Sequence, residues 1–243
     1  YTLTIGDETS NVSVYINGKL TVETGKMANG QTRELICVDK NNNTYIFNVT
    51  CAKFVRTVED LQKIGVGGYF NVLNEQGGID QSVLQGVDSK LEGFDNAGYY
   101  ILANDIDCAG AIIHPGHNYE KSNFTGVFDG NGYTISNFTV GDGGIFGGLK
   151  NATIKNVNFE GIKIDITQYY PGWNYGALLA NKAKDTKIEN VNATFAALAI
   201  NAGYNDPNGN NTKYHTGLLI AQGTNNVIYN NVTMDVTACP NKV

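Results

Sequence analysis

The chain repeats a short pattern as Ile154-Lys155-Asn156-Val157, Ile188-Glu189-Asn190-Val191 and Tyr229-Asn230-Asn231-Val232. A glycine-led apolar run precedes each copy: Gly144-Ile145-Phe146-Gly147, Gly176-Ala177-Leu178-Leu179 and Gly217-Leu218-Leu219-Ile220. Ile135-Ser136-Asn137-Phe138 fits as an earlier copy, which makes the successive spacings 19, 34 and 41 residues. The first spacing suits one level of a solenoid, and loops inserted on one face would lengthen the later ones. The repeat therefore predicts an all-β chain whose levels stack as a parallel β-helix.

Asparagine holds the third position of every copy, at Asn137, Asn156, Asn190 and Asn231. Levels stacked about 4.8 Å apart lay like residues over like. We therefore expect an inward-facing asparagine ladder at a turn, in which each amide bonds to the levels above and below. The alternative is coincidence, because the chain contains 32 Asn.

Composition favours a chain with many turns and argues against some partners. Charged residues make up only 16%, whereas Gly and Asn, which tolerate positive φ in turns, are abundant. The net charge is −6, and Arg33 and Arg56 are the only arginines, so we expect no nucleic-acid partner. The longest apolar run, 193–200, is far shorter than the ~20 residues of a membrane span, so no membrane insertion is expected in this segment.

Three regions differ in their patterns. Residues 1–53 read as short alternating strands with a hairpin turn at Asn17-Gly18, which indicates a small β-sandwich module. Residues 54–98 begin with a short helix signal at Thr57–Leu61 and are interpreted as a helical or irregular cap, with a plain linker as the alternative. Residues 99–243 carry the repeats and are assigned to the β-helix.

The stretches Tyr99–Asp107 and Phe124–Phe138, together with the glycine-led repeats, resemble the GLUG-motif surface proteins of bacteria. The resemblance covers about residues 57–238, and residues 1–53 resemble the Ig-like modules of such proteins. It implies a right-handed parallel β-helix in a secreted or cell-surface, adhesin-like protein, as part of a longer chain. The long interval between Gly65 and Tyr99, and insertions at 165–175 and 200–216, depart from the family pattern.

The two insertions are the predicted recognition surface. They hold the candidate ligand-binding residues Tyr169, Tyr170, Trp173, Tyr175, Tyr204, Asp206, Tyr214 and His215. Aromatic rings beside amides suit glycans and also anchor protein interfaces. We expect a non-catalytic adhesion or binding segment whose partner is a glycan or a host protein. The alternative is that these rings only hold the loops against the solenoid wall.

Catalysis and metal binding have weaker signals. Asp105, Asp107, Asp129 and Asp142 could bind calcium or act as acids, which keeps a polysaccharide-degrading enzyme as an alternative, beside a purely structural spacer. However, Asp129-Gly130-Asn131-Gly132 reads as a turn, and Asp105 and Asp107 are expected to bond to backbone. We predict no catalytic residue, no metal and no cofactor.

The four cysteines, Cys37, Cys51, Cys108 and Cys239, match no zinc-site spacing. A Cys37–Cys51 disulfide and buried free thiols both remain open. If the hairpin turn lies at 41–43, Phe47 is expected opposite Cys37.

Overall fold

The computed structural model describes residues 2–6, 12–16, 19–62, 64, 96–113, 123–141, 143–166, 173–200 and 213–240. In these ranges the chain is all-β apart from one short helix, α1 (Val58–Gln62), and both parallel and antiparallel strand pairs occur. This confirms the predicted all-β class. The described residues contain no helix that is long and apolar enough to cross a membrane.

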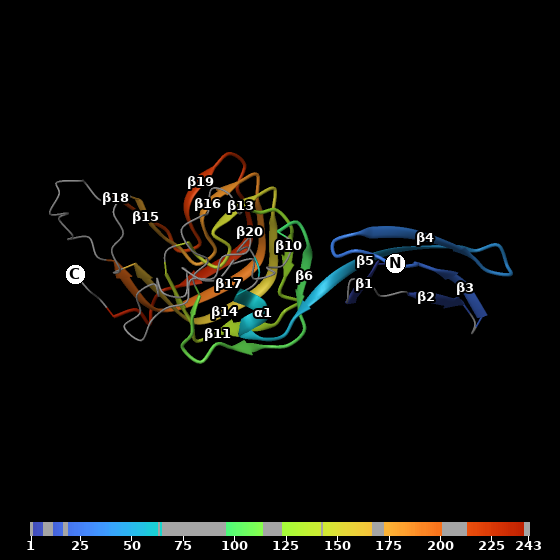
Figure 1. The fold of residues 1–243 in the computed structure, drawn as a ribbon, viewed down its shortest axis with the longest axis horizontal. Coiled ribbons are helices and arrows are strands. Elements are labelled where there is room, and N and C mark those ends of the chain that lie inside the picture. Colours follow the sequence, from blue (N-terminus) through green and yellow to red (C-terminus); the bar gives the residue numbers. More distant parts are fainter. Residues whose placement is uncertain are drawn as a thin grey trace, which may run out of the picture.

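The N-terminal strands form two facing layers (Figure 1). In one layer β5 (Thr44–Val55) pairs in parallel with β1 (Thr2–Gly6) and antiparallel with β4 (Thr32–Val38). The other layer is the antiparallel pair β2 (Ser13–Ile16) and β3 (Lys19–Glu23), which flank the predicted Asn17-Gly18 turn. Residues of β2, β4, β5 and the segment between β3 and β4 pack into one buried core. They are Val14, Met27, Leu35, Cys37, Val49 and Cys51.

The β4–β5 turn closes one residue earlier than predicted, because Asp39 organises it. The Asp39 carboxylate accepts the backbone N–H groups of Asn41 and Asn43, at 2.8 and 2.9 Å, and Asn42 adopts a φ of 63°. Cys37 consequently lies opposite Tyr45, so the expected pairing with Phe47 is wrong. Cys37 and Cys51 are both buried, and no disulfide joins them.

Strand β5 continues into the second half of the molecule (Figure 1), so the predicted boundary after residue 53 falls inside a strand. Its last residues, Lys53–Val55, pair in parallel with β6 (Tyr99–Leu102). Helix α1 then begins where the sequence predicted it. The Thr57 hydroxyl accepts the Asp60 N–H at 3.1 Å, and the Asp60 carboxylate accepts the N–H of Thr57 at 3.3 Å, which is a capping box.

From residue 99 onward, similar sets of strands follow one another along the described chain, and each set is called a level. There are five levels in the described part of the chain. Level 1 holds β6, β7 (Ile106–Asp107) and β8 (Ile112–Ile113), and level 2 holds β9 (Asn123–Phe124), β10 (Val127–Asp129), β11 (Thr134–Ser136) and β12 (Thr139–Val140). Level 3 holds β13 (Gly148–Lys150) and β14 (Thr153–Ile166), and level 4 holds β16 (Ala180–Lys184) and β17 (Lys187–Ile200). Level 5 holds β19 (Ile220–Thr224) and β20 (Ile228–Asp235).

Strands of neighbouring levels pair in parallel and in register. The main sheet contains the order β6, β10, β14, β17 and β20, and a second sheet contains β9, β13, β16 and β19. Matching positions bury apolar side chains between the sheets, as in the column Tyr100, Phe128, Ile154 and Ile188, each 0% exposed. The Phe146 ring lies with its centroid 5.0 Å from that of Phe124 and 5.4 Å from that of Phe128, so both sheets share one core.

The register corrects the predicted assignment of the first repeat. Ile154 pairs with Phe128, whereas Ile135 pairs with Phe159 further along the same strand. Asn137 is therefore not equivalent to Asn156. It lies at a second corner of the level, where its amide donates to Asp107 at 3.1 Å.

The asparagine ladder exists for the other three positions. Asn231 donates to Oδ1 of Asn190 at 2.9 Å, Asn190 donates to Oδ1 of Asn156 at 3.0 Å, and Asn156 donates to Oδ1 of Asp129 at 3.1 Å. The three Asn residues have φ between 50° and 54°, so they form a left-handed corner that Asn tolerates better than most residues. The ladder is not inward-facing as expected: Asn156 is half-buried, while Asn190 and Asn231 are exposed.

Candidate functional site

The two predicted insertions meet as a pair of strands. Strand β15 (Trp173–Gly176) pairs in parallel with β18 (Lys213–Thr216), so that Trp173 aligns with Lys213 and Tyr175 with His215 (Figure 1). Tyr214, a further predicted ligand-binding residue, aligns with Asn174. The other predicted residues, Tyr169, Tyr170, Tyr204 and Asp206, lie outside the described residues.

This strand pair is fixed to the levels beneath it through its glycines. A Cβ atom added at Gly176 would lie only 2.7 Å from Cγ2 of Ile166, which is itself buried at the end of β14. The N–H of Gly217 donates to the carbonyl of Gly176 at 3.0 Å. Gly176 and Gly217 therefore allow the backbone to pack closely at the point where each insertion ends and the next strand of the stacked levels begins.

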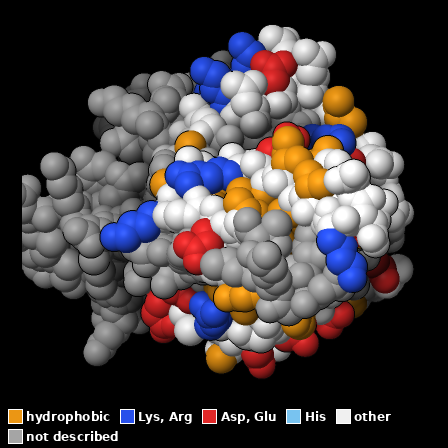
Figure 2. Space-filling view, turned by 90° about the vertical axis from the view of Figure 1, so that its right-hand side faces the viewer, with side chains coloured by type: hydrophobic (Ala, Val, Ile, Leu, Met, Phe, Trp, Pro, Cys, Tyr) orange, Lys and Arg blue, Asp and Glu red, His pale blue; other side chains and the backbone are white. Residues whose placement is uncertain are grey.

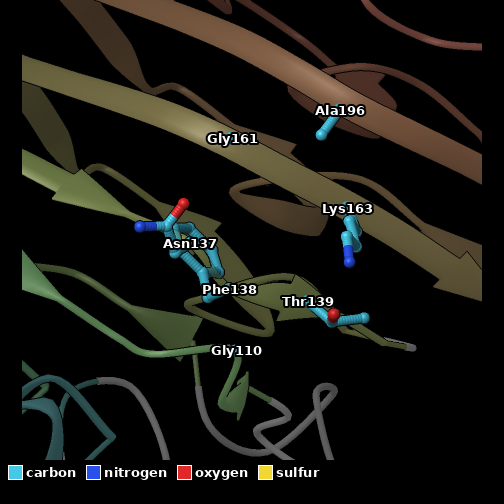
Figure 3. A pocket seen from close by; sticks show the side chains of 7 residues that line it. All are labelled: Gly110, Asn137, Phe138, Thr139, Gly161, Lys163 and Ala196. Atoms are coloured by element: carbon cyan, nitrogen blue, oxygen red, sulfur yellow. The ribbon is translucent and has the colours of Figure 1, made fainter.

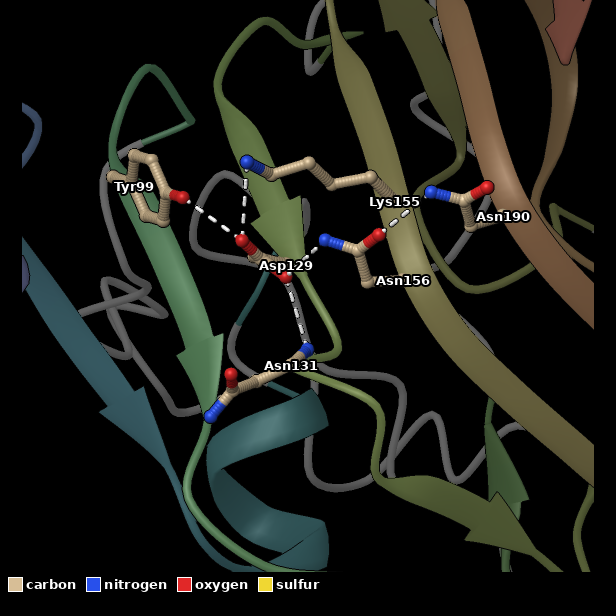
Figure 4. A network of polar contacts seen from close by, with 6 residues as sticks. All are labelled: Tyr99, Asp129, Asn131, Lys155, Asn156 and Asn190. Atoms are coloured by element: carbon tan, nitrogen blue, oxygen red, sulfur yellow. Dashed lines mark hydrogen bonds and ion pairs between the residues drawn. The ribbon is translucent and has the colours of Figure 1, made fainter. Parts of the chain in front are cut away.

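A polar centre, which sequence reasoning missed, lies across three neighbouring strands of the main sheet (Figure 4). The Tyr99 hydroxyl donates to Oδ2 of Asp129 at 2.9 Å, and Nζ of Lys155 lies 3.1 Å from the same oxygen. The Asp129 Oδ1 atom accepts the N–H of Asn131 at 2.9 Å and the amide of Asn156. Lys155 also lies over the Tyr99 ring, 5.5 Å from its centroid.

The charge state of this centre follows from its contacts. Burial raises the pKa of Asp129, but the hydrogen bonds from Asn131, Asn156 and Lys155 outweigh it, so its pKa lies below the usual value. Burial lowers the pKa of Lys155, but the contacts with Tyr99 and Asp129 raise it above the usual value. Burial also raises the pKa of Tyr99. At neutral pH the centre is an ion pair capped by a neutral phenol.

Asp129 is therefore a structural anion. Both of its oxygens are already occupied by donors, whereas a general acid needs a raised pKa and a general base needs a free oxygen. The signal that could have found this centre is register: once Phe128 is aligned with Ile154, Asp129 lies opposite Lys155.

The other predicted carboxylates in the described part are also engaged. Asp105 accepts the N–H of Thr134 at 2.8 Å, and Asp107 accepts the N–H of Ala109 at 2.9 Å, as expected for acids at strand ends. The predicted turn at 129–132 is present, with the N–H of Tyr133 donating to the carbonyl of Gly130 at 2.8 Å. Asp142 lies outside the described residues. Among the residues that are described, no three His, Cys, Asp or Glu side chains gather as a metal site would require.

A pocket of about 200 Å³ opens at the second corner (Figure 3). Gly110 and Gly161 leave it unfilled, while Asn137, Thr139 and Lys163 give it polar walls. A Cβ atom at Gly161 would lie 2.9 Å from Oδ1 of Asn137, so the hollow depends on that glycine. The surface elsewhere is mixed: on the described part of the face in Figure 2, basic, acidic and hydrophobic side chains are interspersed.

Comparison with known proteins gives one finding. Residues 84–194, which are less than half of the 243-residue chain, match the family model of the M26 IgA1-specific metallo-endopeptidase N-terminal region. No curated protein and no solved structure matches the chain.

Proposed function

We propose that this chain is a non-catalytic extracellular binding segment of a bacterial cell-surface protein, built as a right-handed parallel β-helix behind a small Ig-like sandwich. The β15–β18 strand pair is its recognition surface, and the partner is a glycan or a host protein. The observation that carries this proposal is the parallel register of β15 with β18, because it brings two segments rich in aromatic residues together although about 40 residues separate them.

The attachment of β15 and β18 to the stacked levels supports a binding role. Each strand of the pair leaves a stack of levels that share parallel hydrogen bonds and one buried core. A surface held on such a scaffold loses little conformational entropy when a partner binds, so a modest contact area suffices for useful affinity.

The family match supports a segment that accompanies a catalytic region. The matched model describes an N-terminal region of IgA1-specific metallo-endopeptidases. The chain itself has no His-Glu-x-x-His sequence, the pattern that many zinc peptidases use. The match makes IgA1 the first protein partner to test, beside a panel of glycans.

Trp173 provides the direct test, since it is the only tryptophan in the chain. Titration with glycans and with IgA1 should change its fluorescence in a saturable way for at least one ligand. Trp173→Ala removes this fluorophore, so its affinity is measured by isothermal titration calorimetry, and it should be about tenfold or more weaker than that of the parent chain, as expected for an aromatic anchor. Tyr15→Ala, at an exposed aromatic residue on β2, should leave the affinity unchanged. If Trp173→Ala binds as tightly as the parent chain, the β15–β18 pair is not the recognition surface.

A further inference from the structure

The pocket of Figure 3 lies where the two long strands lose their regular pairing. Strands β14 and β17 align without irregularity up to the pair Phe159 and Ala193. Two residues of β14 then face one residue of β17, and directly afterwards Ala196 is an extra residue in β17. Gly161 is one of the two β14 residues and has a φ of 66°. Bulges of this kind are common next to active sites, and here Gly161 and Ala196 both line the pocket.

One end of the pocket presents a hydrogen-bond acceptor. The side-chain amide nitrogen of Asn137 donates to Oδ1 of Asp107 at 3.1 Å, so Oδ1 of Asn137 is directed away from Asp107. It faces Gly161, where an added Cβ atom would lie 2.9 Å from it. This oxygen accepts no hydrogen bond from any residue that the structure describes. It can therefore accept a hydrogen bond from a ligand hydroxyl.

The other end of the pocket presents a cation and a hydroxyl group. Lys163 on β14 aligns with Thr139 on β12, and its ammonium group extends toward Thr139 (Figure 3). Nζ of Lys163 forms no ion pair with a carboxylate in the described part of the chain. An unpaired ammonium beside a hydroxyl suits a carboxylate, which accepts charge-assisted hydrogen bonds.

The size and the apolar part of the pocket limit the ligand further. Phe138 and Ala196 add apolar surface to the lining. The volume of about 200 Å³ is smaller than the roughly 300–1,000 Å³ of pockets that enclose drug-sized molecules. A ligand that fills it is therefore one small unit with a partly apolar body, a carboxylate and at least one hydroxyl group.

We propose that this pocket binds a single sugar ring that carries a carboxylate, such as a hexuronate. The carboxylate pairs with Lys163, the ring hydroxyls bond to Oδ1 of Asn137 and to the Thr139 hydroxyl, and the C–H face of the ring contacts Phe138 and Ala196. The site lies apart from the β15–β18 surface and does not depend on the function proposed for it.

Titration of the ¹⁵N-labelled whole chain with D-glucuronate at constant ionic strength tests this. The amide signals of Gly110, Thr139, Gly161 and Lys163 should shift saturably, with a Kd on the order of 1 mM for so small a ligand. D-Glucose lacks the carboxylate and acetate lacks the hydroxyl groups. Each of them should therefore bind at least about tenfold more weakly than D-glucuronate.

Three variants assign the contacts. Lys163→Gln should weaken D-glucuronate binding about tenfold, because a charge-assisted bond is lost, and Thr139→Val should weaken it about two- to tenfold. Ala196→Leu should abolish binding by filling the pocket while leaving every polar group in place. Lys150→Gln, at an exposed lysine on β13 that does not line the pocket, is the matched control and should bind like the parent chain. Thermal unfolding checks that each variant is folded.

Four results would overturn the proposal. The first is no shift of these signals up to about 50 mM D-glucuronate, well above the expected Kd. The second is equal binding of acetate or D-glucose, which would mean that charge or hydroxyl groups alone are recognised. The third is an unchanged affinity of folded Lys163→Gln or folded Ala196→Leu. The fourth is a set of shifts centred on Trp173–Gly176, which would place the sugar on β15 and leave the function proposed above intact.

Discussion

The side-chain amide of Asn190 donates to Oδ1 of Asn156 at 3.0 Å, across 34 residues of sequence. One level further, Asn231 repeats this bond to Asn190 across 41 residues. The levels thus keep the same corner although the loops between them differ in length. Each of these residues combines a left-handed backbone with a bond to its neighbour, so both properties can be tested separately.

Replacing Asn190 should separate backbone strain from hydrogen bonding. Asn190→Gly keeps the positive φ at little cost and loses only ladder bonds, so it should lower the free energy of unfolding by about 1–2 kcal/mol. Asn190→Ala loses the same bonds and keeps a Cβ in the left-handed region without the amide that lets Asn tolerate it, so it should cost about 1 kcal/mol more than the Gly variant. Urea unfolding should therefore rank the parent chain above the Gly variant and the Gly variant above the Ala variant. Equal stability of both variants would show that the corner backbone is not left-handed.

Two glycines with positive φ, Gly144 and Gly132, should tolerate Ala unequally. A Cβ at Gly144 would lie 2.6 Å from the backbone N of Ala180, whereas a Cβ at Gly132 would meet nothing within 4 Å. Both residues have positive φ, so both changes cost strain. Gly132→Ala should lower the unfolding free energy by about 1–2 kcal/mol, and Gly144→Ala by clearly more because levels 3 and 4 must move apart. Thermal unfolding would contradict this contact if the two variants melted at the same temperature.

The Tyr99–Asp129–Lys155 centre should make the free energy of unfolding depend on pH in the acidic range. The pKa of Asp129 lies below its value of about 3.9 in unfolded chains, so its contribution is present above about pH 4 and is lost as the pH falls through the native pKa. Asp129→Asn should cost about 1–3 kcal/mol at pH 7, because a neutral amide has one acceptor oxygen where the carboxylate has two. The cost should shrink near pH 3.

Urea unfolding of both proteins at pH 7 and pH 3 measures this difference. Asp235→Asn is the matched control: its pKa is also lowered, by the backbone hydrogen bond from Thr237, but its side chain is exposed. This control should have little effect at either pH. An Asp129→Asn cost that is the same at both pH values would rule out the ion pair as its source.

The Cys108 thiol should resist modification in the native protein. Burial raises its pKa to about 11, so almost none of it is thiolate at pH 8, and only the thiolate reacts quickly. Iodoacetamide at pH 8 followed by mass spectrometry should label half-buried Cys239 well before Cys108. Labelling of Cys108 should become rapid in urea. Equal native labelling of both cysteines would place Cys108 at the surface.

Sequence reasoning found the equivalence of residues in β14, β17 and β20 because a short pattern repeats in these strands. The Ile-x-Asn-apolar pattern marks a left-handed corner at Asn156, Asn190 and Asn231, and the strand residue before the corner is buried at Ile154 and Ile188. The same logic failed at Asn137, because level 2 has left-handed residues at two corners, Asn131 and Asn137, and a four-residue pattern does not distinguish them. The first of these corners is the turn at 129–132, where the Asp129 carboxylate accepts the amide of Asn156 and ends the ladder.

The polar centre and the open pocket could not be read from local patterns. Asp129 follows Tyr99 by 30 residues and Lys155 follows Asp129 by 26, and only the inter-level register brings the three together. The β4–β5 register was missed for a related reason: a side chain, that of Asp39, determines where the turn closes. For the insertions, the backbone alignment of β15 and β18 agrees with the predicted shared face, and recognition through it stays a prediction.

Parallel pairing of β15 with β18 brings the two insertions together. Nuclear Overhauser contacts between the backbone protons of these strands measure this pairing. They should link Trp173 with Lys213 and Tyr175 with His215. Contacts that instead link Trp173 with Thr216, or none between the two strands, would show that the insertions share no surface.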